Sequence, residues 1–134
     1  MEIIVYAALG PSGEERALAR RLLAEALARE RGLTGLPAIA AGASGKPFFP
    51  DRPDLQFNLS HSHGAAVCAL HHLPIGVDVE RLRPAPRRLS RGMDDGDFFR
   101  LWTAKEATIK RRALPCAPCF GRFIRYLYKH HAKL

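Results

Sequence analysis

Residues 55–80 read LQFNLSHSHGAAVCALHHLPIGVDVE, and three segments of this stretch have the apolar pattern of β-strands. Apolar and polar residues alternate over 55–60, apolar residues run almost unbroken over 65–71, and alternation returns over 75–79. Alternation with a period of two predicts strands that bury one face. The short spacings between the segments predict neighbouring strands in a meander.

A strand and a helix are expected before this stretch. Residues 2–9 are rich in β-branched and aromatic residues, which predicts a first strand. Apolar residues then recur at helical spacing from Glu14 to Arg31, and Gly32 suits the end of that helix. Ser12 and Glu15 have the spacing of a capping box, in which a hydroxyl and a carboxylate satisfy free amides at a helix start.

The rest of the chain alternates loops with one more helix. Glycine, proline and alanine dominate residues 33–53, and arginine and proline dominate residues 81–92, which predicts a loop and an exposed basic linker. A second helix is expected between Asp97, as its cap, and Pro115, which should stop it near residue 113. For residues 120–134, a short amphipathic helix and a frayed end both stay open. These elements predict an α+β fold with a mainly antiparallel sheet packed by two helices.

Composition favours a folded domain. The 134 residues are 47% hydrophobic and 25% charged, and the net charge of +8 favours anionic partners. The first residues have no basic region before the apolar ones, and no apolar stretch approaches the ~20 residues of a membrane span. The odd number of cysteines argues against a disulfide framework. We interpret Cys116 and Cys119 as reduced surface residues and expect the protein in a reducing cytoplasm.

Acidic and hydrogen-bonding residues end the predicted strands. Asp78 and Glu80 are two apart on a strand, so both point to one face and suit a hard cation such as Mg²⁺. An ordinary solvent-exposed polar face is the alternative. Ser60 and His61 close an earlier strand with groups that can donate to phosphate, although such clusters also occur as plain turn residues.

The second predicted helix carries Glu106 one turn after Trp102 and one turn before Lys110. The alternative to a functional role is a core tryptophan beside an exposed ion pair. Lys46 lies between a glycine and a proline, which lets a loop hold an ammonium group near an anion.

Four motifs in a fixed order indicate a protein family more specifically than any one of the motifs does. They are Gly45-Lys46-Pro47, then residues 57–62 (FNLSHS), residues 75–80 (IGVDVE) and residues 101–110 (LWTAKEATIK). Together they resemble the successive motifs of the 4'-phosphopantetheinyl transferase superfamily, in its larger, synthase-modifying type. The acidic strand lies mid-chain, behind a helix and a Ser-His strand, as in that type.

The resemblance implies an enzyme that transfers 4'-phosphopantetheine from coenzyme A to a serine of an acyl or peptidyl carrier protein and releases 3',5'-ADP. It implies three residues that bind the 3'-phosphate of coenzyme A, namely Lys46, Ser60 and His61. It implies three residues that surround Mg²⁺, namely Asp78, Glu80 and Glu106. Glu106 would also be the base for the carrier serine, and Lys110 would stabilise charge on the transferring phosphate.

The resemblance covers a first half and the opening helix of a second half, whereas larger family members contain two similar halves. We therefore expect a phosphopantetheinyl transferase-like domain over residues 1–114, a basic aromatic tail over 115–134, and self-association as an open question. Two other functions stay open: a non-catalytic protein that keeps the fold and binds coenzyme A, and a basic module that binds nucleic acid.

Overall fold

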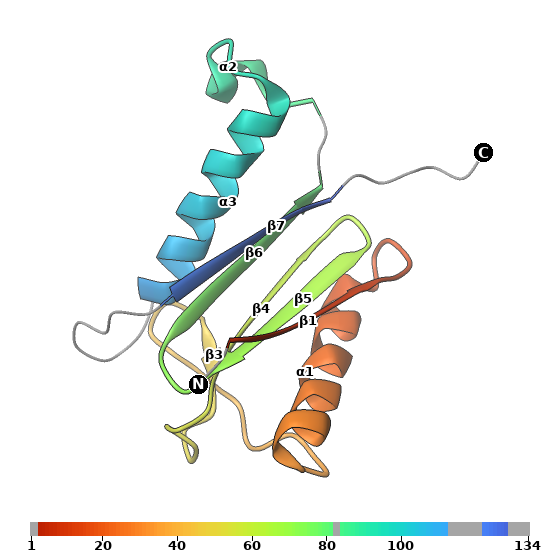
Figure 1. The fold of residues 1–134 in the computed structure, drawn as a ribbon, viewed down its shortest axis with the longest axis vertical. Helices are drawn as coiled ribbons and strands as arrows, with labels where there is room; N and C mark the ends of the chain where they lie inside the picture. The colour runs from red at the N-terminus through yellow and green to blue at the C-terminus, as the bar shows by residue number, and fades with distance from the viewer. Residues whose placement is uncertain (1–2, 82–83, 113–121, 129–134) are drawn as a thin grey trace.

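The computed structural model describes residues 3–81, 84–112 and 122–128, with the backbone alone described for 107, 108, 110–112 and 122–128. Its elements in chain order are β1 (Ile4–Leu9), α1 (Glu15–Arg31), β2 (Ala40–Ala41), β3 (Pro47–Phe48), β4 (Gln56–Ser62), β5 (Ala65–His71), β6 (Ile75–Arg81), α2 (Arg87–Ser90), α3 (Asp95–Arg112) and β7 (Arg122–Tyr128) (Figure 1). No helix among these residues combines the length and apolar character needed to span a membrane.

The strands form one three-stranded sheet and two two-stranded pairs. β5 lies between β1 and β4 and is antiparallel to both, and β6 pairs with β7 in parallel. The expected meander is thus confirmed for β4 and β5 and wrong for β6. Side chains of β4 occupy the edge of β6 instead: Asn58 Oδ1 accepts from the Val77 amide at 2.7 Å, and Ser60 Oγ accepts from the Val79 amide at 3.2 Å.

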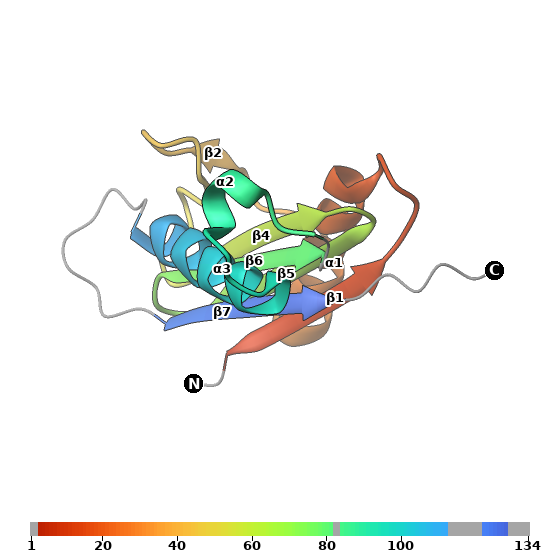
Figure 2. The same cartoon turned by 90° about the horizontal axis from the view of Figure 1, so that it is seen from above.

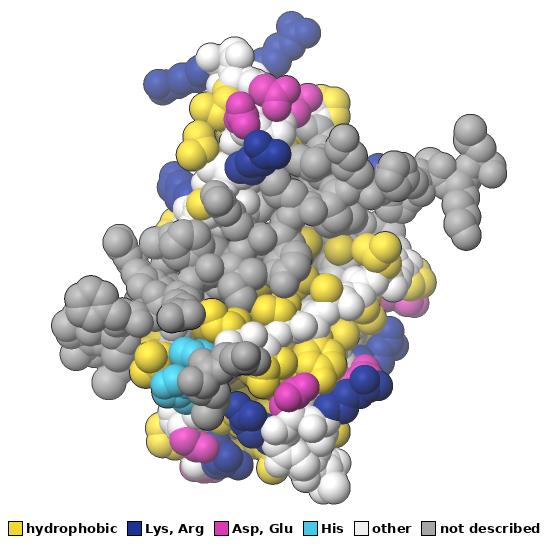
Figure 3. Space-filling model, in the orientation of Figure 1, with side chains coloured by type: hydrophobic (Ala, Val, Ile, Leu, Met, Phe, Trp, Pro, Cys, Tyr) yellow, Lys and Arg dark blue, Asp and Glu magenta, His cyan; other side chains and the backbone are white. Residues whose placement is uncertain are grey.

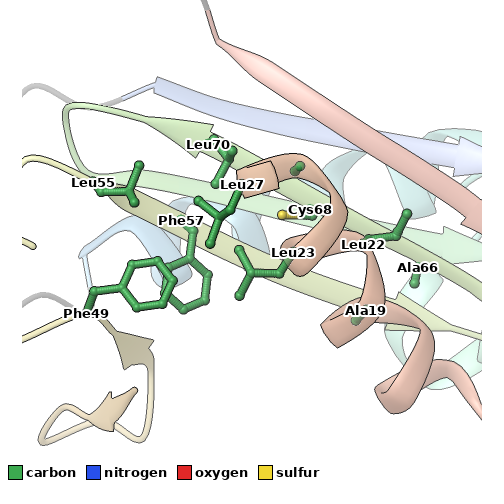
Figure 4. Packing of buried hydrophobic residues seen from close by; sticks show 11 residues of the cluster. Ala19, Leu22, Leu23, Leu27, Phe49, Leu55, Phe57, Ala66, Cys68 and Leu70 are labelled. Carbon is green, nitrogen blue, oxygen red and sulfur yellow. The ribbon is translucent and has the colours of Figure 1, made fainter. Parts of the chain in front are cut away.

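The three-stranded sheet is covered on both faces. On one face, α1 buries Leu22, Leu23 and Leu27 against residues of β4 and β5 that include Phe57 and Leu70 (Figure 4). Each of these side chains removes apolar surface from water, which stabilises the fold by about 1.5–3 kcal/mol for a fully buried leucine or phenylalanine.

The opposite face of the sheet packs on β6. Its contact residues are the small and branched side chains Ala65, Val67, Ala69, Ile75, Val77 and Val79. β6 and β7 lie between this sheet and α3, so the molecule is layered in the order α1, sheet, β6–β7 and α3 (Figures 1 and 2). The valines of β6 face the core as the alternating pattern predicted, and Asp78 and Glu80 line a pocket with residues of β4 and α3.

Both predicted helices form, and they differ from expectation only in how their first turns are capped. α1 ends at Gly32, as predicted, in a left-handed conformation with φ 65°. The capping box is only half right, because the Glu15 carboxylate accepts from the Gly13 amide at 2.9 Å while the helix has no side-chain cap. Asp94, and not Asp97, caps α3, since its carboxylate accepts from the amides of residues 96 and 97.

Two segments have a different structure from the one expected. The basic linker folds in part into α2, because the amides of Leu89 and Ser90 both bond to the carbonyl of Pro86. The helical alternative for the tail is wrong over residues 122–128, which form β7 beside β6. Aromatic and branched residues in that segment favour a strand once an edge is available for pairing. The α+β class is confirmed, with one parallel pair added to the expected antiparallel sheet.

Candidate functional site

One pocket, of about 380 Å³, collects residues from three separate parts of the chain. β4 contributes one group of lining residues, β6 a second and α3 a third; they are Leu59, Ser60, His61, Asp78, Val79, Glu80, Trp102 and Glu106. Five of these eight are the residues that the sequence analysis singled out as phosphate or metal ligands. The structure therefore brings together Ser60, His61, Asp78, Glu80 and Glu106.

Asp78 is buried at the base of this pocket. Its side chain is 4% exposed, and its Oδ1 accepts a hydrogen bond of 3.1 Å from Ser60, which is 5% exposed. The alternative of an ordinary solvent-exposed polar face is therefore wrong for Asp78. A carboxylate at this depth loses much of its hydration, so its surroundings must supply hydrogen bonds or a cation.

Glu80, two residues further along β6, lies nearer to solvent. Its side chain is half-buried, and its Oε2 accepts from the Ser62 hydroxyl at 3.4 Å. The same hydroxyl lies 2.9 Å from Nδ1 of His63. Alternate polar residues of β4 thus contact both acidic residues of β6.

α3, which packs on β6 and β7, carries aromatic side chains beside Glu106. Phe99 is 1% exposed, and the Trp102 ring stacks on Phe98 with 6.0 Å between ring centroids. Lys105 places its ammonium group 6.0 Å from the centre of the Trp102 ring. Trp102 is half-buried in the pocket wall, in place of the fully buried core position that the alternative assigned to it.

The three acidic side chains have the chemistry of a Mg²⁺ site. Mg²⁺ is usually held by one or two carboxylates together with phosphate oxygens and water, and Asp78, Glu80 and Glu106 all border one pocket. Within the described residues, no group of three or more His, Cys, Asp or Glu side chains is assembled closely enough to hold a metal ion by itself. Asp78, Glu80 and Glu106 are thus described residues that could supply carboxylate oxygens to a cation in this pocket.

One expected site residue lies outside the pocket lining, and the side chain of another is not described. Lys46 precedes β3, and its ammonium group donates to the carbonyl of Ile75 at 2.9 Å, at the start of β6 and outside the pocket lining. Lys110 belongs to α3, but its side chain is outside the described part of the structure, as are Cys116 and Cys119.

The sequence analysis missed the contact that holds the turn after β4. Glu15 accepts from the Gly64 amide at 2.7 Å in addition to the Gly13 amide, and the Gly10 amide donates to the Gly64 carbonyl at 2.7 Å. Hydrogen bonds from the backbone amides of Glu15 itself, Gly13 and Gly64 hold the pKa of the Glu15 carboxyl below its ordinary value of 4.5. Because His61 lies on the strand that enters this turn, Glu15 links the start of α1 to the mouth of the pocket.

The chain is similar to several curated proteins named 4'-phosphopantetheinyl transferase. It is 35% identical over 83 residues to 4'-phosphopantetheinyl transferase Sfp of Bacillus subtilis (strain 168), covering 50% of this chain and 37% of Sfp. It is 41% identical over 88 residues to HetI of Nostoc, covering 49% and 37%, and 33% identical over 126 residues to AcpT of Salmonella typhi, covering 78% and 63%. Both are 4'-phosphopantetheinyl transferases by name. No protein-family model matches the chain, which spans less than two fifths of the length of Sfp and HetI.

Proposed function

Because the chain belongs to the 4'-phosphopantetheinyl transferase superfamily, we propose that it transfers the phosphopantetheine arm of coenzyme A to a serine of an acyl or peptidyl carrier protein. The observation that carries the proposal is one pocket in which β4, β6 and α3 place side chains from three of the four motifs. As in the larger, synthase-modifying type, these motifs occur in the order Ser-His, acidic strand, Glu-bearing helix.

His61 is the residue best placed to meet the 3'-phosphate of coenzyme A. It is exposed at the pocket mouth, and an imidazole can donate to a phosphate oxygen. Lys46 would join it by exchanging its bond with the Ile75 carbonyl for one with the anion, which its long side chain permits. Ser60 lies in the same pocket, beneath His61.

Asp78, Glu80 and Glu106 would hold Mg²⁺ against the pyrophosphate of coenzyme A. When bound, Mg²⁺ would neutralise the charge of the pyrophosphate and orient it. The donor set fits this ion because hard carboxylate oxygens are the ligands that Mg²⁺ prefers. Substrate phosphate oxygens complete such sites, and the described protein groups alone do not form one.

The reaction replaces one phosphorus–oxygen bond by another. The hydroxyl oxygen of the carrier serine attacks the β-phosphorus of coenzyme A, the bond from that phosphorus to the bridging oxygen breaks, and 3',5'-ADP leaves with the bonding electrons. Glu106 would accept the serine proton from its position on α3, and Lys110 would stabilise the negative charge on the transferring phosphoryl group. Positioning and charge neutralisation account for most of the catalysis in such transfers.

A basic nucleic-acid module is the less favoured function. Arginines around α2 are exposed, but exposed Asp94, Asp95 and Asp97 lie among them, and Figure 3 shows both charges at that end of the molecule. Nucleic-acid binding draws on surfaces where positive charge accumulates without such compensation. The charge distribution around α2 thus gives phosphate-driven nucleic-acid binding little support.

Calorimetric titration with coenzyme A, in the presence of Mg²⁺ and of EDTA, tests the proposed pocket. We expect binding that Mg²⁺ strengthens in the parent protein and that Mg²⁺ no longer strengthens in Asp78→Asn. Asp51→Asn is the matched control, because Asp51 is exposed in the loop before β4 and should leave binding unchanged. Coenzyme A binding that is equal in the parent and in Asp78→Asn at all Mg²⁺ concentrations would contradict the assignment.

A further inference from the structure

The hydroxyl of Ser60 is already engaged on both sides. It donates to Oδ1 of Asp78 at 3.1 Å and accepts from the Val79 amide at 3.2 Å. A serine hydroxyl has one proton to donate, so a hydroxyl that donates to Asp78 does not at the same time donate to a phosphate oxygen. Ser60 therefore differs from His61, its exposed neighbour, although both belong to the same motif.

The depth of the Ser60–Asp78 pair strengthens this contact. Both side chains are at most 5% exposed. A hydrogen bond from a hydroxyl to a carboxylate is stronger than one between neutral groups, and water competes little with it in a buried site. Ser60 also holds the backbone of β6, since the amide it accepts from belongs to the residue after Asp78.

We propose that Ser60 is a positioning residue, which orients Asp78 toward the metal and makes no direct contact with the 3'-phosphate of coenzyme A. This inference rests on the proposed function, and it changes the role that the family resemblance implied for Ser60. The two residues of the Ser-His motif then have different roles: the serine orients a metal ligand, and the histidine binds the 3'-phosphate.

Two ligand measurements separate the two roles. The first is the apparent affinity for Mg²⁺ at saturating coenzyme A, followed by the fluorescence of Trp102, which is the single tryptophan and lies in the pocket wall. The second is the ratio of the affinities for coenzyme A and 3'-dephospho-coenzyme A, which isolates the contribution of the 3'-phosphate. Ser60→Ala, Ser60→Thr and His61→Ala are compared with the parent.

We expect Ser60→Ala to weaken Mg²⁺ binding by about 10-fold to 100-fold, the usual effect of removing a group that orients a metal ligand, and to leave the affinity ratio unchanged. Ser60→Thr keeps the hydroxyl and should restore most of the Mg²⁺ affinity. His61→Ala should do the reverse of Ser60→Ala, lowering the affinity ratio with little effect on Mg²⁺. A Ser60→Ala protein that loses the preference for coenzyme A and keeps its Mg²⁺ affinity would overturn the proposal.

A measurement on the ligand-free protein keeps this inference separate from the proposed function. Ser60→Ala removes the acceptor of the Val79 amide, whereas the Val77 amide keeps its acceptor on Asn58. Hydrogen exchange followed by NMR should therefore accelerate at Val79 and stay unchanged at Val77, which also shows that the variant is folded. Unchanged exchange at Val79 would refute the contact of the Ser60 hydroxyl with β6, which holds that hydroxyl beside Asp78. A parent protein that binds neither coenzyme A nor Mg²⁺ would instead refute the proposed function.

Discussion

Gly64 lies where the turn between β4 and β5 meets the turn before α1, and its replacement by alanine should destabilise the protein measurably. The backbone of Gly64 has φ +83°, and a Cβ built on it would lie 2.8 Å from the carbonyl oxygen of Gly10. Real Cβ contacts are essentially never that short, and the obstructing atom belongs to the backbone, so no side-chain rotation relieves the clash. The two turns must separate, although hydrogen bonds join them through Gly10 and Glu15.

The size of the effect follows from two terms. A non-glycine residue in the left-handed region costs about 1–2 kcal/mol. Forcing an extra methyl group into occupied space adds about 1–3 kcal/mol. Gly92→Ala carries only the first term, because Gly92 has φ +80° and open space around a built Cβ, so the difference between the two variants isolates the second term. Gly64→Ala should therefore lower the free energy of unfolding by about 1–3 kcal/mol more than Gly92→Ala does.

Urea denaturation followed by circular dichroism measures this difference directly. Equal free energies of unfolding for the two variants would refute the close approach between Gly64 and Gly10. Because His61 lies on the strand entering the turn, Gly64→Ala should also weaken coenzyme A binding at temperatures where the variant is folded, whereas Gly92→Ala should not.

Three further predictions concern stability and reactivity. Amide hydrogen bonds lower the pKa of Glu15, so the ionised carboxylate stabilises the protein above pH 4.5, and this contribution is lost as the pH falls below that value. Glu15→Gln should therefore flatten the acid limb of a profile of stability against pH. An unchanged profile would count against the contact. Leu27→Ala removes a fully buried side chain and should cost about 2–5 kcal/mol in urea denaturation, whereas Leu101→Ala, at a residue 60% exposed on α3, should stay within about 0.5 kcal/mol of the parent. Burial raises the pKa of the Cys68 thiol to about 12. In a variant whose other two cysteines are replaced by serine, this thiol should resist alkylation at pH 8 until urea unfolds the protein. Rapid alkylation of the native form would contradict the burial of Cys68.

The local parts of the fold could be predicted because short-range chemistry determines them. The apolar repeat of α1 and the glycine after it define a helix and its end without reference to the rest of the chain. Alternation in residues 75–79 likewise predicted β6, but it carries no information on the partner strand. The partner depends on Asn58 and Ser60, whose side chains take the β6 edge amides that an antiparallel neighbour would otherwise bind.

The composition of the site could be predicted better than its geometry. Spacing put Asp78 and Glu80 on one face of a strand, yet it could not show that β4 and α3 cover that face and bury Asp78. The long-range contact of Glu15 could not be predicted from spacing either. Its spacing from Ser12 indicated a local cap, whereas its hydrogen bond to the Gly64 amide joins residues 49 apart in sequence. Contacts of that kind appear only once the strands are placed in space.

Mass spectrometry of a carrier protein, incubated with this chain, coenzyme A and Mg²⁺, tests the central claim most directly. A panel of acyl and peptidyl carriers is needed, and Sfp of Bacillus subtilis serves as the positive control. The account predicts that at least one carrier gains the mass of a single phosphopantetheine group on its serine, and that EDTA and the Asp78→Asn change each prevent this gain. Carriers that Sfp modifies but that this chain leaves unmodified, at high enzyme concentration and with coenzyme A and Mg²⁺ saturating, would contradict it.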